Sequence, residues 1–299
     1  MLNPKPELRN RIEKLLGKEA DKFWEVCEEP PRAIIRVNTL KITPEDLKKR
    51  LKWKISTIKD FPEAIVIETI YEPGALGKSL EHQTGLYYVQ ELSSMMSPLA
   101  LDPKPGETVL DLCAAPGSKT TQMAAMMKNK GLLIANDPQM NRLRALSTNL
   151  ERCGVTNTII TRMNGATLCE KLAKRNMFFD KILLDAPCSG EGVMRSDPNV
   201  CTMWNPNMIK KIAGLQKKLM ASALKCLKKG GILVYSTCTL EIEENEGVVQ
   251  FALDKFPVEL VEFKLPIKTR GGFGISKVKR IWPQDNDTEG FFVAKLRKK

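Results

Sequence analysis

Two cysteines are the residues of this chain best suited to covalent chemistry, because each follows a short apolar run of similar composition. Cys188 lies in D-A-P-C-S-G-E-G after K-I-L-L-D, and Cys238 lies in Y-S-T-C-T-L after G-I-L-V-Y. A cysteine thiolate is highly nucleophilic even near neutral pH, so it can add to a carbon atom and split one hard step into two easier ones. Neighbouring parallel strands lie about 5 Å apart, so thiols just past two such strands can face one reacting group.

The remaining cysteines outside the loop described next are expected to be small buried hydrophobes, the usual state of a free cysteine. They are Cys27, Cys153, Cys169, Cys201 and Cys226. We expect thiols rather than disulfides. A metal site is not expected, because the sequence has no C-x-x-C or H-x-x-x-H pair and its only histidine is His82, which we interpret as structural.

A second chemical signal is the loop V-L-D-L-C-A-A-P-G-S-K-T, which follows an apolar run and opens a predicted helix. It is not a Walker loop, because Ser118 separates Gly117 from Lys119, and it is not a dinucleotide loop, because it contains a single glycine. The small residues Ala114 and Ala115 instead allow an adenosyl ligand without a pyrophosphate to approach the backbone. In a doubly wound sheet, this turn is where nucleotide-like ligands bind.

Asp137 ends the next apolar run, about 20 residues after the loop, at a place where an acid commonly binds ribose hydroxyls. The alternative is an aspartate that caps a helix beginning at Pro138. Both interpretations remain open from the sequence.

The elements that position these residues form a repeated pattern of strand, loop and helix from Thr108 onward. Apolar runs without alternation indicate strands buried on both faces, which predicts an α/β fold with a doubly wound, mostly parallel sheet. A helix is predicted over Asn207 to Lys229, ended by Gly230 and Gly231. Its apolar face would consist of Met208, Ile212, Leu215, Leu219 and Ala223. The strand runs are T-V-L-D-L, G-L-L-I-A-N-D, N-T-I-I-T-R-M-N, K-I-L-L-D and G-I-L-V-Y-S-T.

The first hundred residues have a different pattern, typical of a small α+β appendage. We expect a helix over Pro6 to Glu28, a strand beginning at Arg32, and a helix capped by Thr43 with Pro44 in its first position. The predicted division is an appendage over 1–102 and a second domain over 103–299, joined by the P-K-P-G segment.

The formal net charge of +12 favours a polyanionic partner such as nucleic acid, although a solvated Lys/Glu-rich surface is the alternative. The segment K-K-R-L-K-W-K, from Lys48 to Lys54, suits phosphate contact with base stacking on Trp53, or is simply a basic helix end. No apolar run approaches the roughly 20 residues that span a bilayer, and the N-terminus lacks a signal-peptide core, so we expect a cytoplasmic protein without a membrane partner.

Three motifs in this order, L-D-L-C-A-A-P-G-S-K-T, I-L-L-D-A-P-C-S-G-E-G and V-Y-S-T-C-T-L, resemble the S-adenosylmethionine-dependent RNA 5-methylcytosine methyltransferases of the Sun family. The resemblance extends from about Gly85 to the C-terminus and includes T-E-G-F-F-V-A-K-L. It implies a Rossmann-like class I methyltransferase domain, S-adenosylmethionine as cofactor and RNA as substrate. Carbon 5 of cytosine accepts a methyl group only after a nucleophile adds at carbon 6, which explains the need for a thiol.

By this resemblance Cys238 is the attacking thiol, and Cys188 assists release of the methylated base. Asp185 would bind the base amine and ring nitrogen and also contact the cofactor, and Lys119 would keep that carboxylate ionised. Where the family usually has an acid for the adenine amine, this chain has Asn164, whose carbonyl oxygen can accept the same hydrogen bond. The cofactor residues would be Cys113, Ala114, Ala115, Pro116, Gly117, Ser118, Lys119, Asp137, Arg142, Asn164, Gly165, Asp185 and Pro187.

The substrate is expected to be RNA with an exposed or loosely paired cytosine, since the base must be extruded to meet the thiol. The short appendage looks most like the archaeal tRNA-modifying branch, so tRNA is the first expectation and ribosomal RNA the second. We expect a monomer. The other hypotheses are a non-catalytic RNA-binding scaffold, disfavoured by the intact thiols, and a nucleotide-dependent oxidoreductase or NTPase, disfavoured by the missing glycine patterns.

Overall fold

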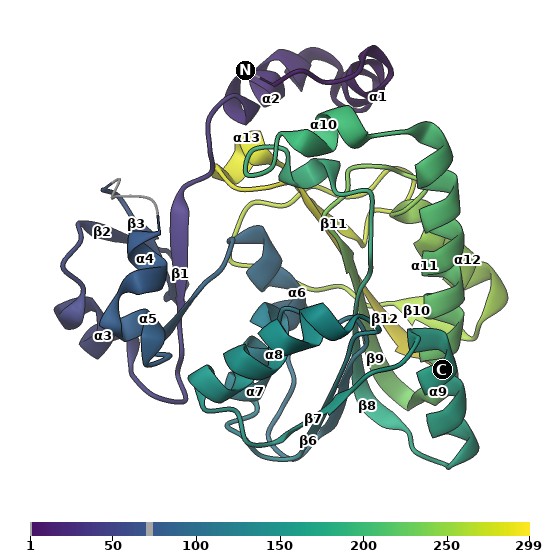
Figure 1. The fold of residues 1–299 in the computed structure, drawn as a ribbon. Coiled ribbons are helices and arrows are strands. Elements are labelled where there is room, and N and C mark those ends of the chain that lie inside the picture. The colour runs from purple at the N-terminus through teal and green to yellow at the C-terminus, as the bar shows by residue number, and fades with distance from the viewer. Residues whose placement is uncertain (1, 70–73) are drawn as a thin grey trace.

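The computed structural model describes residues 2–69 and 74–299, which contain two β-sheets (Figure 1). The smaller sheet is antiparallel, with strand order β2-β3-β1-β4. The larger sheet has the order β10-β12-β9-β8-β5-β6-β7, and β11 pairs with β12. The strands are β1 (Ala33–Val37), β2 (Ile55–Ile58), β3 (Phe61–Ile67), β4 (Tyr87–Val89), β5 (Thr108–Asp111), β6 (Leu132–Asn136), β7 (Thr158–Thr161), β8 (Phe179–Asp185), β9 (Leu227–Thr237), β10 (Val258–Leu260), β11 (Lys279–Ile281) and β12 (Phe291–Lys298).

The helices connect these strands and cover the sheets. In the first part of the chain they are α1 (Pro6–Leu16) and α2 (Ala20–Cys27), which lie beside α10, and then, around the smaller sheet, α3 (Pro44–Arg50), α4 (Ala75–Lys78) and α5 (Leu80–Gln83). Around the larger sheet they are α6 (Met96–Leu101), α7 (Ser118–Met126), α8 (Met140–Cys153), α9 (Gly165–Lys174), α10 (Asn199–Met203), α11 (Pro206–Cys226), α12 (Glu246–Lys255) and α13 (Pro283–Asn286). Thr43 caps α3 by accepting a hydrogen bond from the Asp46 backbone N–H, as its sequence predicts.

The five predicted apolar runs form the parallel strands β5 to β9, which confirms the α/β class and the mostly parallel sheet. The strand order reverses between β5 and β8, because the chain continues from β5 to β6 and β7 on one side and places β8 and β9 on the other. Ligands of such sheets bind outside the carboxyl ends of the strands at this reversal. The antiparallel strand β12, which pairs with both β9 and β10, completes the sheet.

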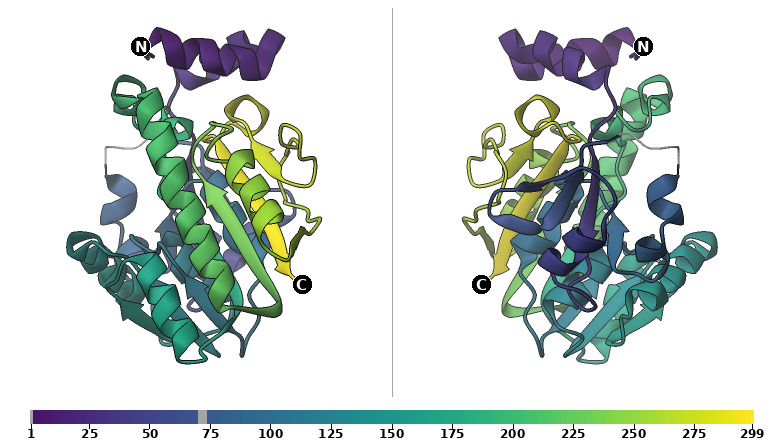
Figure 2. Two further views of the ribbon diagram at one scale, coloured as in Figure 1. Left: turned by 90° about the vertical axis from the view of Figure 1, so that its right-hand side faces the viewer. Right: turned by 90° about the vertical axis from the view of Figure 1, so that its left-hand side faces the viewer.

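The core of the larger sheet has two sides (Figure 2). On one side, Leu168 of α9, Leu219 of α11 and Val248 of α12 pack against the strands. On the other side, Leu101 of α6 and Met123 of α7 share a cluster with buried residues of the smaller sheet. The smaller sheet is therefore part of the packing on that face, as the view with the dark β1 in front also shows.

Two predictions about helices are wrong. The predicted helix from Pro6 to Glu28 is two helices, because Gly17 adopts a left-handed φ of 55° and a 3-10 turn (Gly17–Glu19) changes the chain direction. Both helices contribute to a buried cluster that includes Phe23 of α2, Cys201 of α10 and Trp204, and α2 also contacts α13. The glycine pair does not end the long helix either, because α11 ends at Cys226 and β9 already begins at Leu227.

The glycine pair instead lies inside β9, where its pairing with β8 shifts register. A Cβ at Gly231 would lie 3.0 Å from the carbonyl oxygen of Asp180 on β8, so the close approach of the strands explains this glycine. The predicted apolar face of α11 is confirmed at Leu219 and Ala223, which are buried, but not at Leu215, which is 40% exposed; in the first half of the helix the buried residues are Ile209, Ala213 and Gln216.

The division at residue 102 remains a prediction, since α6 packs against β8, β9 and β12 of the larger sheet. The five cysteines expected to be buried are buried. Within residues 2–69 and 74–299, no helix has both the length and the apolar character that crossing a membrane requires.

Candidate active site

The two thiols lie together at the carboxyl ends of adjacent parallel strands. Asp185 of β8 and Ser236 of β9 are register partners, and the chain reaches Cys188 and Cys238 shortly after them. The sulfur atoms of Cys188 and Cys238 are 3.0 Å apart and partly exposed. The sheet register therefore places both sulfur atoms where they can reach one ring.

The two thiols are not equivalent. The hydrogen bond with Cys238 and burial raise the pKa of the Cys188 thiol. A thiol that keeps its proton can donate it to the neighbouring sulfur and so stabilise that sulfur as a thiolate. The geometry therefore favours Cys188 as the sulfur that keeps its proton.

A carboxylate ends β8 beside the thiol pair. Lys119 Nζ lies 2.7 Å from Asp185 Oδ2, and Ser236 Oγ donates a 2.7 Å hydrogen bond to Asp185 Oδ1. The Lys119 side chain is 11% exposed and that of Asp185 is 24% exposed, so the pair has limited contact with solvent. Both carboxylate oxygens are thus oriented, with one edge still accessible to a polar ligand.

The loop between β5 and α7 is held by residues of α8. Gly117 begins α7 with a φ of 106°, and a Cβ there would lie 2.9 Å from Leu146 Cδ1, so a glycine is needed. Arg142 Nη2 donates to the Ala115 carbonyl at 2.5 Å, and Asn149 Nδ2 donates to the Pro116 carbonyl at 2.9 Å. The Ala115–Pro116 peptide bond is cis.

One carboxylate oxygen of Asp137 accepts a hydrogen bond from the protein, and the other accepts none from the described residues. Oδ1 accepts a 2.9 Å hydrogen bond from the Gln139 backbone N–H at the start of α8. Arg142 Nη1 lies 3.0 Å from Oδ2, but not in line for a hydrogen bond, and this buried oxygen has no other partner among the described residues. A ligand hydroxyl fits that oxygen, so the capping and ribose-binding interpretations both agree with the geometry.

Asn164 is placed differently from its predicted role. Its Oδ1 accepts hydrogen bonds from the N–H groups of Ala166 and Thr167, at 3.1 and 3.3 Å, so it caps α9. The side-chain carbonyl expected to bind an adenine amine is therefore already engaged. Next to it, a Cβ on Gly165 would lie 2.9 Å from Leu219, which leaves room only for glycine.

The other predicted cofactor residues lie in the same region, at the carboxyl ends of β5, β6 and β8, which is called the cofactor region below. Cys113 is partly buried, and burial raises the pKa of its thiol, which keeps it neutral. The carbonyl of Ser118 accepts a 2.6 Å hydrogen bond from Arg36 Nη1, and the carbonyl of Pro187 accepts a 2.9 Å hydrogen bond from Gln216. The cofactor region thus combines the backbone of the loop after β5, the Asp137 carboxylate and the Asp185–Lys119 pair.

Several residues that build the site were missed in the sequence. Glu191 and Glu244 are buried between the two cysteine loops, and Gln216 of α11 joins them. Their signals were the acidic residues in C-S-G-E-G and E-I-E-E-N-E-G, which follow the two cysteines closely. Arg36, a charged residue inside an apolar strand, was a further signal.

Two predictions about the basic segment and the histidine concern the smaller sheet. Trp53 packs edge to face with Tyr87, with ring centroids 6.5 Å apart, so its ring serves the core of that sheet. His82 Nδ1 lies 3.0 Å from the Gly77 carbonyl oxygen, and burial together with Arg152 lowers its pKa. Both contacts favour the structural interpretation of these two residues.

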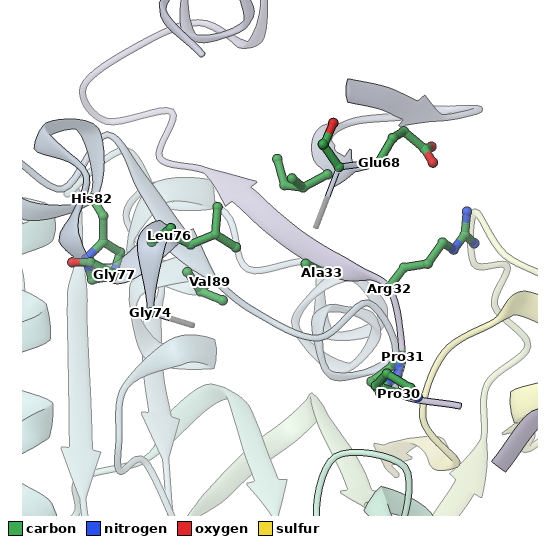
Figure 3. Close-up of a pocket in the computed structure, with 13 residues that line it drawn as sticks. Pro30, Pro31, Arg32, Ala33, Glu68, Gly74, Leu76, Gly77, His82 and Val89 are labelled. Atoms are coloured by element: carbon green, nitrogen blue, oxygen red, sulfur yellow. The ribbon is translucent and has the colours of Figure 1, made fainter. Parts of the chain in front are cut away.

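A cavity of about 790 Å³ lies at the smaller sheet rather than at the thiols. Figure 3 shows its lining around the start of β1 and the α4 region, with Arg32, Leu76, His82 and Val89 among the labelled residues. The volume of this cavity does not make it the reacting site, because the two thiols and the Asp185–Lys119 pair lie elsewhere, at the carboxyl ends of β5, β8 and β9.

Comparison with protein families gives two adjoining matches. The family model for the 16S rRNA methyltransferase RsmB/F matches residues 98–297. The model for the N-terminal domain of the 16S rRNA methyltransferase RsmF matches residues 5–92.

Two curated relatives differ in length. The chain is 44% identical over 289 residues to the ribosomal RNA small subunit methyltransferase F of Psychromonas ingrahamii, and the match covers 92% of this chain and 59% of that protein. It is 42% identical over 294 residues to the tRNA (cytosine(49)-C(5))-methyltransferase of Pyrococcus abyssi, covering 94% of this chain and 92% of that protein. The chain therefore spans less than two thirds of the first relative and nearly all of the second.

Two solved structures have the same fold over nearly the whole chain. A methyltransferase homologue from Pyrococcus horikoshii superposes with a TM-score of 0.85 at 41% identity, covering 97% of this chain and 94% of that chain. The structure of NSun6 from the same organism with SFG gives a TM-score of 0.88 at 31% identity, with 98% of each chain covered.

Proposed function

The chain belongs to the RsmB/F family, the Sun family of S-adenosylmethionine-dependent RNA cytosine-5 methyltransferases, and we propose that it methylates carbon 5 of a cytosine in tRNA through a covalent cysteine adduct. The observation that carries this proposal is the 3.0 Å approach of Cys188 and Cys238 at the sheet reversal, beside the Asp185–Lys119 pair. This arrangement supplies a nucleophile, an acid and a fixed carboxylate to one planar ring.

In the proposed reaction, Cys238 attacks carbon 6 of the cytosine as a thiolate. The Cys188 thiol stabilises the anion before attack through the contact between the sulfur atoms. Addition at carbon 6 moves electron density onto carbon 5, which then becomes nucleophilic. In the later release step Cys188, having given up its own proton, accepts the proton on carbon 5. The electrons of that C–H bond re-form the double bond between carbons 5 and 6 as the bond from carbon 6 to Cys238 breaks, and Cys238 leaves as a thiolate.

Asp185 orients the base and stabilises its protonated form. Ser236 and Lys119 fix its two oxygens, so an accessible edge can accept hydrogen bonds from the exocyclic amine and the ring nitrogen. Lys119 also places a positive charge 2.7 Å from Asp185 Oδ2.

The residues that would hold S-adenosylmethionine are the Cys113–Gly117 backbone, the Asp137 carboxylate and, beside it, Arg142. The buried Oδ2 of Asp137, which has an ion-pair contact with Arg142 but accepts no hydrogen bond, fits a ribose hydroxyl, and the loop without a glycine-rich phosphate cradle fits a ligand that has no phosphate. When bound, this cofactor supplies the methyl group as an electrophile. Asn164 would contribute mainly by keeping α9 capped.

The substrate assignment rests on the names of the relatives and on charge. The relative that this chain matches over 92% of its length is named as a tRNA cytosine-C5 methyltransferase. The net charge of +12 suits a polyanionic substrate. Ribosomal RNA is the second candidate, because the RsmF relative is 44% identical. One copy of the chain provides both thiols, the carboxylate and the cofactor loop, so we propose that it acts as a monomer.

The decisive experiment uses labelled S-adenosylmethionine with tRNA and 16S rRNA transcripts, followed by digestion and detection of 5-methylcytosine. We expect transfer to tRNA by the native chain and none by Cys238→Ala. Cys188→Ala should accumulate a protein–RNA adduct that survives a denaturing gel. Cys27→Ala, which removes a buried thiol in another cluster, is the matched control and should remain active. Full activity of Cys238→Ala would refute the nucleophile, and transfer only to 16S rRNA would refute the tRNA assignment.

A further inference from the structure

Two buried acidic side chains lie between the loops that carry the thiols. Glu191 opens the 3-10 turn η3 (Glu191–Val193) after Cys188 and is 1% exposed. Glu244 follows Cys238, just before α12, and is fully buried. Carboxylates are rarely buried so completely unless each oxygen has a partner, so their hydrogen bonds determine which protons they carry.

Glu191 contacts three donors. Its Oε1 accepts a 2.7 Å hydrogen bond from the Leu240 backbone N–H and another from the Thr239 hydroxyl. Its Oε2 lies 2.6 Å from Ser189 Oγ. These contacts join the Cys188 loop to the Cys238 loop, and every group in them can act as the donor toward a carboxylate.

Glu244 makes a second connection between the loops. Its Oε2 accepts hydrogen bonds from the Ser189 N–H at 3.1 Å and from Gln216 Nε2 at 2.7 Å. Gln216 Nε2 also donates to the Pro187 carbonyl, and the Tyr235 hydroxyl donates to the Glu244 carbonyl. The remaining oxygen, Oε1, is hydrogen-bonded to Ser189 Oγ.

The hydrogens at Ser189 are too few for two carboxylates. Its Oγ contacts Glu191, Glu244 and, at 3.0 Å, the hydroxyl oxygen of Thr239, whose own hydrogen is used toward Glu191. A serine hydroxyl has one hydrogen, so with both acids ionised one carboxylate oxygen would face another acceptor in a buried site. Leaving a buried acceptor unpaired is costly, and one additional proton removes that cost.

We propose that Glu191, Ser189 and Glu244 hold this additional proton as a unit, with Glu244 the neutral acid that donates to Ser189 Oγ and Glu191 the carboxylate. Glu244 is thereby a positioning residue, which fixes the Cys188 and Cys238 loops through Ser189. Its relevance to methyl transfer rests on the function proposed above, whereas its protonation does not.

Burial and the neighbouring charges support this placement of the proton. Burial, together with the charge of Glu191, raises the pKa of Glu244 to about 7, although the hydrogen bonds from Ser189 and Gln216 act in the opposite direction. The titratable groups that face Glu244 in the described part of the chain are Glu191 from η3, Cys188 from its loop and Tyr235 from β9. An ionised Glu244 would raise the pKa of Cys188 and oppose a thiolate nearby, so its neutral form favours the anion that the reaction needs.

The test compares three variants. Glu244→Gln matches the neutral acid, because Nε2 can donate to Ser189 while the amide oxygen accepts from the Ser189 N–H and Gln216. Glu244→Ala removes both connections. In Glu191→Gln the amide oxygen keeps Leu240 and Thr239, so Nε2 faces Ser189. The negative charge that raises the pKa of Glu244 is also lost, so we expect Glu244 to ionise in this variant.

Infrared difference spectroscopy at about pH 6 tests the proton without any substrate. The native chain minus Glu244→Gln should show the carbonyl band of a protonated carboxylic acid, and the same band should be absent from Glu191→Gln. Circular dichroism would first confirm that each variant is folded. The absence of the band from the difference between the native chain and folded Glu244→Gln would overturn the proposal.

Methyl transfer to tRNA tests the positioning role. We expect Glu244→Ala to lower kcat by 100-fold or more, Glu244→Gln to recover it to within about 3-fold of the native chain, and Glu191→Gln to lose at least 10-fold. The ratio of the native kcat to that of Glu244→Gln should fall as the pH rises from about 6 to about 8.5. Equal activity of Glu244→Gln and Glu244→Ala, or tolerance of Glu191→Gln alone, would overturn the assignment. An inactive native chain would refute the proposed function while leaving the infrared result to decide the proton.

Discussion

Replacing Arg280 should destabilise the chain strongly, because its guanidinium group is part of a buried ion pair close to the nucleophile loop. Arg280 Nε and Nη2 donate to the two oxygens of Glu246 at 2.7 and 2.6 Å, and the two side chains are 2% and 4% exposed. Arg280 Nη1 also donates to the Leu240 carbonyl at 2.8 Å, just beyond Cys238. Arg280→Met removes these donors and leaves the charge of Glu246 buried with the Phe273 N–H as its remaining donor among the described contacts.

Breaking a buried pair by removing one partner typically costs about 3–5 kcal/mol, whereas replacing both partners by apolar residues is often nearly neutral. We therefore expect Arg280→Met to lower the free energy of unfolding by about 4 kcal/mol, or Tm by roughly 10 °C for a chain of this size. Arg280→Met/Glu246→Leu should recover most of that loss.

Urea unfolding followed by circular dichroism measures both effects. The matched control is Arg297→Met, because the Arg297–Glu259 pair has a 3.6 Å separation and side chains that are 49% and 46% exposed. Exposed pairs contribute about 0–1 kcal/mol, so this change should be small. A loss under about 1 kcal/mol in Arg280→Met, or a double variant as unstable as the single one, would refute the reasoning.

Three further predictions concern polar residues at the ends of β5 and β6 and at the start of α9. Asp137→Ala should weaken the binding of S-adenosylhomocysteine, measured by calorimetry, by at least 10-fold, because it removes the oxygen proposed to accept a hydrogen bond from a ribose hydroxyl. An unchanged affinity would show that Asp137 does not bind the ligand. Asn164→Ala should cost about 1 kcal/mol of stability through the lost α9 cap while changing that affinity less than 3-fold. Burial raises the pKa of Asp111 to about 7, so the native state holds a proton that the unfolded chain releases near pH 4. Its contribution is present at low pH and is lost as the pH rises to about 7, by up to about 4 kcal/mol, and Asp111→Asn should flatten this part of the unfolding profile.

Local patterns in the sequence predicted the parts of the fold that depend on neighbours along the chain. The strands β5 to β9 follow from uninterrupted apolar runs, and the Thr43 cap follows from its T-P-E-D context. The break at Gly17 and the start of β9 at Leu227 did not follow, because a glycine in a helical pattern can be tolerated and the glycine pair resembled a helix end. What decided both was packing against distant elements.

The same distinction applies to the site. Two thiols after two similar strands could be recognised from sequence, and the register of β8 with β9 brings them together. The partners of Ser189 could not be predicted, because Glu191, Glu244 and Gln216 meet only after α11 and β9 are in place. The capping role of Asn164 was missed because the same carbonyl oxygen could serve a helix or a ligand.

Arg36 of β1 connects the smaller sheet to the methyltransferase part of the chain, which contains the larger sheet. Its buried guanidinium donates to the Ser118 carbonyl and to Thr121 Oγ1, at the first turn of α7. A fragment starting at residue 103 would lack both β1 and α6, so these acceptors would lose Arg36 and the apolar side of α7 would be uncovered. Engineers who wish to shorten this protein, or to exchange its leading segment for another, must therefore transplant β1 together with the methyl-transferring half.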